Sequence, residues 1–265
     1  MLVSLVVATI GRNDTLPILL DSLERQTDDS FEVIVVDQNQ NDDVQALLQG
    51  RKFKWSRLRS PRGASLARNA GIRHAAGEVI AFPDDDCHYP PDTIGRVRTF
   101  FEQNRCCDGV VGKWTSERRE QITRYNLFYQ AGTCFFFLRR SALSRIGDFD
   151  ERFGPGPNAQ YPGGEDSDLL IRALRLGMVI RRDPSIVIFH PAVSFGEMDR
   201  NKVFTYAIAR MALLRKHRYP LWFKCANVAY PLVQLVFRPR AAGYYWKMFT
   251  GRLSGLIMRP GGQMK

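Results

Sequence analysis

Short apolar segments alternate with helix-like segments through the first half of the chain, and this alternation constrains the fold more than any other feature. The strand-like segments span residues 2–8, 31–36, 55–59 and 78–82. Helices are predicted between them, one capped by Asn13 or Asp14 and one over 65–76 that is closed by Gly77. Such alternation is typical of an α/β fold with a mainly parallel sheet and helices on both faces.

Beyond residue 105 the order of elements becomes mixed. Further strand-like segments lie at residues 109–113, 133–138, 179–182 and 186–189. A loop rich in Gly and Pro covers 154–164, and Glu165 opens a helix that runs to about Leu176. A second helix is predicted over 202–216.

Polar and acidic residues stand at the ends of the predicted strands. Thr9, Asp37 and the run Asp84-Asp85-Asp86 each follow a strand's carboxyl end. In open parallel sheets, ligands bind outside these carboxyl ends. The sequence therefore predicts that three polar clusters converge on one edge of the sheet and form a site there.

The three consecutive carboxylates indicate a divalent cation. Unneutralised neighbours of this kind repel one another, and Mg²⁺ or Mn²⁺ relieves the repulsion while also binding phosphate oxygens. The plainer alternative is a solvated acidic turn, which Pro83, Pro90 and Pro91 would favour.

Three further candidates each have a plainer alternative. Asp37 can accept hydrogen bonds from a base or a ribose, although a lone strand-end Asp is also a common turn former or helix cap. Arg68 lies in a helix whose amino end suits phosphate, or it is an ordinary surface arginine. Glu165 and Asp166 either complement the dipole of their helix or, after two glycines, approach a ligand closely.

Five segments carry a resemblance to a known family. They are residues 6–12, 31–37, 63–71, 77–86 and 163–169. In this order they resemble the motifs of a family 2 glycosyltransferase with the GT-A fold, over roughly residues 2–190. The resemblance implies an inverting, metal-dependent hexosyltransferase that uses a nucleotide-sugar donor, UDP-hexose being the default from family frequency.

The resemblance also implies roles on the donor side. Thr9 and Arg12 would line the nucleotide pocket, Asp37 would contact the base, and Arg68 would approach the diphosphate. The turn Gln38-Asn39-Gln40-Asn41-Asp42 departs from the small, acidic, Ser-containing turn of most relatives. This departure leaves the identity of the base open.

The same resemblance assigns the acidic run and a late histidine. Asp84 and Asp86 would stand in the Asp-x-Asp position and bind Mg²⁺ or Mn²⁺, with Asp84 and Asp85 also contacting the nucleotide sugar. His190 resembles a late histidine that contacts metal or diphosphate in some relatives, or it is a satisfied strand-end histidine. Cys87 replaces the usual polar or acidic residue after the run and leaves the sugar open.

On the acceptor side, the resemblance implies that Asp166 is the general base and that Glu165 orients the acceptor. Asp166 would remove a proton from an acceptor hydroxyl as that oxygen attacks the anomeric carbon. Either the segment around 115–125 or the loop at 154–164 would close over the sugar.

The net charge of +11 belongs to the C-terminal tail. Residues 201–265 contain twelve Lys or Arg and no Asp or Glu. Aromatic residues are interleaved with these cations, a composition that suits an anionic membrane surface. The alternative for the helix over 202–216 is that it packs back on the catalytic domain.

We therefore expect a GT-A domain over 1–200 and a basic, aromatic, membrane-associating helical segment over 201–265. Nucleotide-sugar binding falls at about 1–114 and acceptor binding at about 115–200. No window approaches the ~20 apolar residues of a membrane span, and no signal peptide is recognised. The expected location is the cytoplasmic face of a bacterial plasma membrane, with a saccharide or polyprenyl-diphosphate-linked acceptor in surface polysaccharide synthesis.

Two other classes compete with this interpretation. A sugar-phosphate nucleotidyltransferase would carry a Gly-rich, Lys-bearing loop after the first strand, whereas residues 8–13 contain only Gly11 and Arg12 as candidates. A nucleic-acid-binding protein would use the cationic tail. The acidic site argues against the second class because it would repel phosphate without a metal, so no nucleic acid is expected.

Overall fold

The computed structural model describes residues 1–113, 122–129, 132–191 and 199–258. The chain divides into two compact units. Unit 1 comprises Met1–Phe149 and Leu169–Pro191, and unit 2 comprises Asp150–Asp168 and Ala192–Lys265. This division differs from the expected boundary at residue 200, because residues 150–168 cluster with the C-terminal helices. Most of the expected mobile segment around 115–125 lies outside the described residues.

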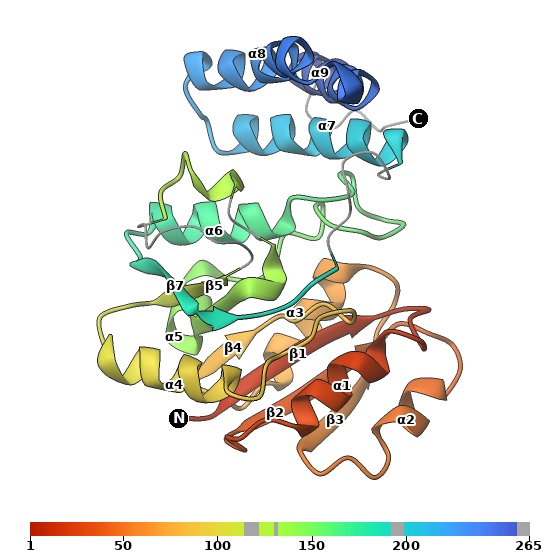
Figure 1. The fold of residues 1–265 in the computed structure, drawn as a ribbon, viewed down its shortest axis with the longest axis vertical. Helices are drawn as coiled ribbons and strands as arrows, with labels where there is room; N and C mark the ends of the chain where they lie inside the picture. Colours follow the sequence, from red (N-terminus) through yellow and green to blue (C-terminus); the bar gives the residue numbers. More distant parts are fainter. Residues whose placement is uncertain (114–121, 130–131, 192–198, 259–265) are drawn as a thin grey trace. The chain divides into compact units, whose positions relative to one another are not determined.

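Unit 1 is built on one seven-stranded sheet in the order β3-β2-β1-β4-β6-β5-β7 (Figure 1). The strands are β1 Val3–Thr9, β2 Phe31–Asp37, β3 Lys54–Arg59, β4 Val79–Ala81, β5 Gly109–Lys113, β6 Phe136–Arg139 and β7 Ile180–Val187. β1 to β4 are parallel, and β6 runs antiparallel between β4 and β5. The predicted mainly parallel α/β architecture is confirmed.

The helices of unit 1 follow the strands as expected. They are α1 Leu16–Glu24, α2 Asp43–Leu48, α3 Ala64–His74, α4 Thr93–Gln103 and α5 Arg140–Ile146, and α6 Glu165–Arg175 begins in unit 2. Short 3-10 helices cover Leu127–Tyr129 and Thr133–Phe135. The cap assigned to Asn13 or Asp14 was wrong, because Thr15 occupies the N-cap of α1. The amide of Asn13 instead donates a hydrogen bond to Asp43.

Three local predictions differ from the structure. The helix expected to close at Gly77 ends at His74, with extended backbone at Ala75. A Cβ at Gly77 would lie 2.7 Å from the Leu2 carbonyl oxygen, so this glycine permits close approach to β1. The segment 133–138 is a 3-10 turn followed by β6, and the two strands expected over 179–189 form the single strand β7.

The core of unit 1 is closely packed where α3 crosses β1 and β2. All seven residues of β2 are buried. A Cβ on Gly71 of α3 would overlap Cγ1 of Val6 and lie 3.1 Å from Cγ2 of Val36. Gly71 therefore sets how near the helix can lie to the sheet.

Gly71→Ala should destabilise unit 1 by about 1–3 kcal/mol, because the added methyl group overpacks a rigid interface. The matched control is Gly95→Ala in α4, where the new Cβ would meet no atom closer than 3.8 Å. Since Ala has the higher helix propensity, this control should gain about 0.5–1 kcal/mol. Urea unfolding of both variants measures the difference, and equal changes would contradict the packing argument.

Unit 2 contains a layer of three long helices (Figure 1). They are α7 Arg200–Lys216, α8 Leu221–Phe237 and α9 Ala242–Ile257, with a 3-10 turn at Pro239–Ala241. The predicted helix over 202–216 is confirmed, and its expected apolar side is buried, consisting of Val203, Ala207, Met211 and Leu214. None of the described helices combines the length and the apolar character that crossing a bilayer would need.

Candidate active site

The ends of β1 and β4 bring the acidic run into contact with Thr9 and Arg12. Thr9 Oγ1 donates a 2.7 Å hydrogen bond to Asp85 Oδ2. Arg12 Nη1 lies 3.2 Å from Asp86 Oδ2, and its Nε lies 4.0 Å from Asp85 Oδ1. The convergence that parallel strand ends predict is therefore present in unit 1.

Asp85 is held in an environment that is unfavourable for a charge. Burial raises the pKa of Asp85 to about 6, although the hydrogen bond from Thr9 and the charge of Arg12 both lower it. The neighbouring carboxylates of Asp86 and Asp84 raise it further. Burial is thus the main cause of the raised pKa of Asp85, and the repulsion from its two neighbours is a smaller contribution.

Arg68 and His190 complete this cluster from two other elements. Arg68 Nη2, on α3, lies 3.1 Å from Asp84 Oδ1. His190 Nε2 lies 3.3 Å from Asp86 Oδ1 and 3.7 Å from Asp84 Oδ2. The backbone of Phe189 pairs with that of His88, and this pairing places the next residue, His190, beside the acids.

The donor atoms near Asp86 fit a hard divalent cation. Asp86 Oδ1 is buried and has no hydrogen-bond partner among the described residues. Across the same residues, no group of three or more His, Cys, Asp or Glu side chains is arranged to hold a metal ion. Asp84, Asp86 and His190 are therefore not arranged as a complete ligand set in this structure, and Mg²⁺ or Mn²⁺ would need phosphate and water oxygens as further ligands.

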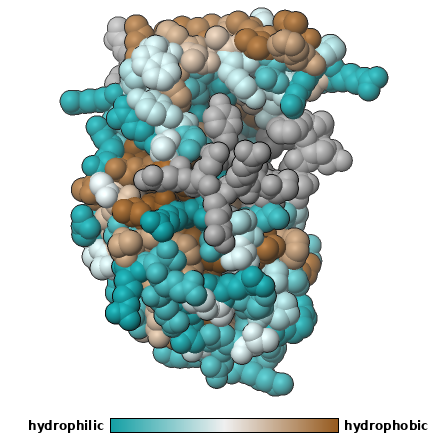
Figure 2. Space-filling model, turned by 60° about the vertical axis from the view of Figure 1, so that its left-hand side comes forward, coloured by the Kyte–Doolittle hydropathy of each residue, from teal (hydrophilic) through white to brown (hydrophobic). Residues whose placement is uncertain are grey.

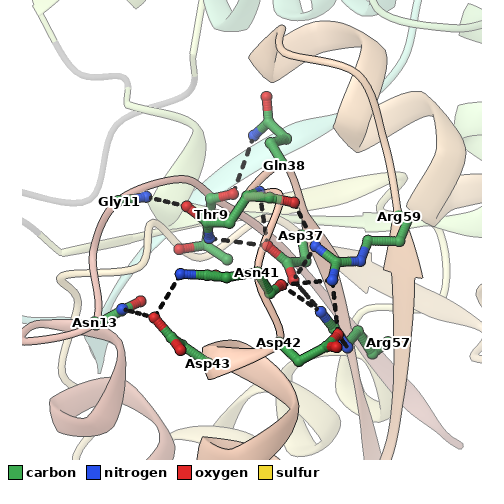
Figure 3. Close-up of polar contacts among 11 residues, drawn as sticks. Thr9, Gly11, Asn13, Asp37, Gln38, Asn41, Asp42, Asp43, Arg57 and Arg59 are labelled. Carbon is green, nitrogen blue, oxygen red and sulfur yellow. Dashed lines mark hydrogen bonds and ion pairs between the residues drawn. The ribbon is translucent and has the colours of Figure 1, made fainter.

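Asp37 lies in a polar cluster at the end of β2, which hydrogen bonds from Gly11 to Asn39 and from Gln38 to Thr9 link to the end of β1 (Figure 3). Its side chain is fully buried, and Oδ1 accepts hydrogen bonds from the backbone and side-chain nitrogens of Asn39 at 2.9 Å each. Oδ2 lies 2.8 Å from Arg57 Nη2 and 3.2 Å from Arg59 Nη1. Both arginines also pair with Asp42, at 2.8 and 2.7 Å.

This cluster fixes the turn that follows β2. The guanidinium of Arg59 donates to the carbonyl oxygens of Asn39 and Asn41, and that of Arg57 also donates to Asn41. The two arginines were missed from the sequence. The available signal was their alternate spacing on β3, which places them on one face of a strand next to Asp37.

A pocket of about 780 Å³ opens at the carboxyl ends of β1, β2 and β3. Its lining consists of Ile10, Gln38, Asn39, Gln40, Arg59, Ser60, Pro61 and Arg62. The polar groups on the wall are thus amides, a hydroxyl and guanidinium groups. Asp37 stands behind this wall, and its oxygens already accept hydrogen bonds within the chain.

Glu165 and Asp166 open α6 in unit 2, and a buried ion network surrounds the same turn. Asp168 Oδ1 is 2.7 Å from His217 Nε2 and 2.5 Å from Lys216 Nζ. Lys216 Nζ is also 2.7 Å from Asp150 Oδ2. This network ties the segment 150–168 to the C-terminal end of α7, and no local pattern near these residues predicts it.

Asp150 supplies a pH-dependent part of the stability of unit 2. Burial raises the pKa of its carboxyl, but hydrogen bonds from Arg152 and Lys216 outweigh that effect and lower the pKa well below its usual range. A depressed pKa contributes stability that is present above the unfolded-state value and lost as the pH falls. Asp150→Asn should therefore cost about 2 kcal/mol at neutral pH, and the difference should shrink below about pH 4.

Urea unfolding of the wild type and of Asp150→Asn, at neutral pH and below about pH 4, measures this difference in stability. The matched control is Asp148→Asn, whose exposed carboxylate pairs with an exposed Arg73 at 3.3 Å. That substitution should change stability by less than about 0.5 kcal/mol. An equal loss in both variants, or a loss for Asp150→Asn that does not vary with pH, would contradict the argument.

The family model for glycosyl transferase family 2 matches residues 4–161. The chain belongs to this family. Among curated relatives, this family 2 glycosyltransferase is 23% identical to glycosyltransferase AglE of Haloferax volcanii over 251 residues, covering 83% of this chain and 79% of that one. An uncharacterized glycosyltransferase of Haemophilus influenzae is 34% identical over 105 residues, covering 39% of this chain and 35% of that protein. The match thus spans about a third of the Haemophilus protein.

Solved structures show the fold of this family 2 glycosyltransferase. The mannosyltransferase PcManGT of Pyrobaculum calidifontis, in complex with GDP-Man and Mn²⁺, superposes with a TM-score of 0.71 at 16% identity, covering 96% of this chain and 87% of that one. S. aureus TarS in complex with UDP gives a TM-score of 0.62 at 15% identity, covering 96% and 91%. The predicted GT-A fold is confirmed.

Proposed function

We propose that the chain is a metal-dependent, inverting glycosyltransferase that moves a hexose from a UDP-sugar to a hydroxyl of a lipid-linked saccharide. The observation that carries this proposal is the cluster at the carboxyl edge of unit 1, where Thr9 and Arg12 meet Asp85 and Asp86. The pocket beside it, on the ends of β1 to β3, has room for a nucleoside.

The residues of unit 1 would bind the donor. Amide and guanidinium groups of the pocket wall would contact the base and ribose, while Arg68 and Arg12 supply positive charge beside the acids. Asp84, Asp86 and His190 would hold Mg²⁺ or Mn²⁺, which when bound neutralises negative charge on the departing diphosphate. TarS is known in complex with UDP and UDP-GlcNAc, and PcManGT with GDP-Man and Mn²⁺, which supports a nucleotide sugar as donor.

The first turn of α6 would act on the acceptor. Asp166 would take the proton from the attacking hydroxyl, and Glu165 would orient the acceptor through hydrogen bonds to its other hydroxyl groups. Attack from the face opposite the departing diphosphate inverts the anomeric configuration.

The acceptor would be a polyprenyl-diphosphate-linked saccharide at the cytoplasmic face of a bacterial plasma membrane, in surface polysaccharide synthesis. The cationic C-terminal segment, with twelve Lys or Arg and no acidic residue in 201–265, supports this location.

The proposed donor and the proposed metal dependence are tested by a thermal-shift scan of UDP, GDP and dTDP sugars with and without Mn²⁺. We expect one nucleotide class to stabilise the chain, and only in the presence of the metal. Equal stabilisation with and without Mn²⁺ would contradict metal dependence. No stabilisation by any donor, together with tight binding of RNA, would overturn the glycosyltransferase proposal.

A further inference from the structure

The solvent-facing side of α8 is apolar along its whole length. Every exposed residue of this helix is apolar, namely Leu221, Trp222, Cys225, Ala226, Ala229, Leu232, Val233, Val236 and Phe237. These positions recur with helical spacing and form one stripe. The two buried residues are Asn227 and Pro231, so the helix presents its apolar side to solvent and a polar residue to its neighbours.

The inward-facing polar groups of α8 are satisfied. Arg210 of α7 donates to Asn227 Oδ1 at 3.1 and 3.2 Å, and Arg252 of α9 donates to the Asn227 carbonyl oxygen at 2.5 Å. The orientation of α8 is therefore fixed by hydrogen bonds to α7 and α9. The apolar stripe faces outward because the opposite side has these partners.

Helix α9 extends the apolar surface. Its exposed large side chains are Trp246, Leu253 and Ile257, while Gly251 and Gly255 let its other side press against α7. A Cβ on Gly251 would lie 2.5 Å from the Phe204 carbonyl oxygen. Figure 2 shows apolar side chains gathered over these two helices at the top of the view. We call the exposed side of Leu221–Phe237 and Ala242–Ile257 the α8–α9 face.

The charges around this face are all of one sign. Lys224 and Lys247 lie on the two helices, and Arg238 and Arg240 are exposed in the turn that joins them. Exposed apolar area of this extent marks an interaction site, and flanking cations select an anionic partner. A second copy of the chain fits less well, because a two-fold interface would bring the same cations together without a carboxylate to neutralise them.

We propose that the α8–α9 face docks on an anionic lipid bilayer. Both helices lie in the plane of the interface, with Trp222, Val236 and Phe237 among the upper acyl chains. Arg238 and Arg240 contact headgroup phosphates. The proposal rests on the proposed function only for its purpose, which is to bring the enzyme to a lipid-linked acceptor.

Flotation with vesicles tests this docking. The full chain is mixed at low ionic strength with vesicles of phosphatidylcholine alone, or of phosphatidylcholine and phosphatidylglycerol in equal parts. We expect strong binding to the mixed vesicles only. Val236→Ser with Phe237→Ser should lower the partition coefficient at least about tenfold, since two exposed apolar anchors are lost.

A charge variant and a control complete the design. Arg238→Gln with Arg240→Gln should lower binding to the mixed vesicles about tenfold and leave the weak binding to neutral vesicles unchanged. Ile18→Ser removes a half-exposed apolar side chain from α1 and should float like the wild type. Donor stabilisation measured without vesicles should be equal in all variants, which shows that each one is folded.

Three outcomes would overturn the proposal. The first is that the wild type does not float, or that the Val236 and Phe237 variant floats equally well. The second is that the wild type sediments as a dimer, the Val236 and Phe237 variant sediments as a monomer, and neither binds vesicles. This result would assign the face to a second copy of the chain. The third is salt-sensitive binding to an oligonucleotide but not to vesicles. A failure of donor stabilisation would overturn the proposed function and leave the flotation result standing.

Discussion

Asp86→Ala is expected to remove the Mn²⁺-dependent part of donor binding and to lower kcat/KM by about 10²- to 10³-fold. Asp86 Oδ1 is buried without a hydrogen-bond partner among the described residues, and His190 Nε2 lies 3.3 Å away. On the proposed function, this carboxylate would be a ligand of the cation beside the diphosphate, and its removal would weaken cation binding. Negative charge on the leaving group is then neutralised less well in the transition state.

Without metal, Asp86→Ala is not expected to weaken donor binding. When Mn²⁺ is removed, the Asp86→Ala variant should bind the donor as well as the wild type or slightly better, because one repelling charge is gone. Asp92→Ala, on an exposed carboxylate that pairs with Arg96, is the matched control and should behave like the wild type in every assay. Retained Mn²⁺-dependent stabilisation in Asp86→Ala would exclude Asp86 as a ligand.

Asp166→Asn is expected to lower kcat by about 10³-fold while donor binding and its dependence on Mn²⁺ stay unchanged. The amide keeps the shape of the side chain but cannot take a proton from the acceptor. Steady-state kinetics at saturating donor, together with the thermal-shift assay of donor binding, measures this difference.

Ser167→Ala provides the neighbouring control. The Ser167 backbone nitrogen donates a 2.6 Å hydrogen bond to Asp166 Oδ1, and this contact survives the removal of the hydroxyl. The Ser167 variant should therefore keep near-normal activity. If Asp166→Asn retained activity within about tenfold of the wild type, the general base would have to be sought elsewhere.

The sheet edge and its acids could be predicted because they depend on local pattern. β1 and β2 are almost wholly buried, and their sequences are accordingly apolar except at Ser4 and Glu32, with polar ends at Thr9 and Asp37. Parallel pairing then aligns Thr9 with Asp37, and the residues after β4 reach Thr9 and Arg12. Pattern and topology together place these side chains without knowledge of tertiary contacts.

The ion network around Asp168 and the single strand β7 could not be predicted, because both depend on contacts between segments that are distant in the sequence. Lys216 and Asp168 are 48 residues apart, and nothing near either residue signals the other. β7 was predicted as two strands, over 179–182 and 186–189. In the structure β7 is one strand, but its pairing with β5 shifts register between Arg182 and Val187. Pro184 lies in this irregular stretch of an edge strand, where its missing N–H costs no regular ladder hydrogen bond.

The two arginines of β3 have a consequence for engineering the donor pocket. Arg57 and Arg59 hold Asp37, Asp42 and the carbonyl groups of the intervening turn, so the wall of the pocket is built before any ligand arrives. A chimaera that imports only the turn at 38–42 from another transferase would keep Asp37 but remove the Asp42 carboxylate, with which both guanidinium groups pair. On the proposed function, base preference would therefore be exchanged as a pair of elements, the turn together with β3.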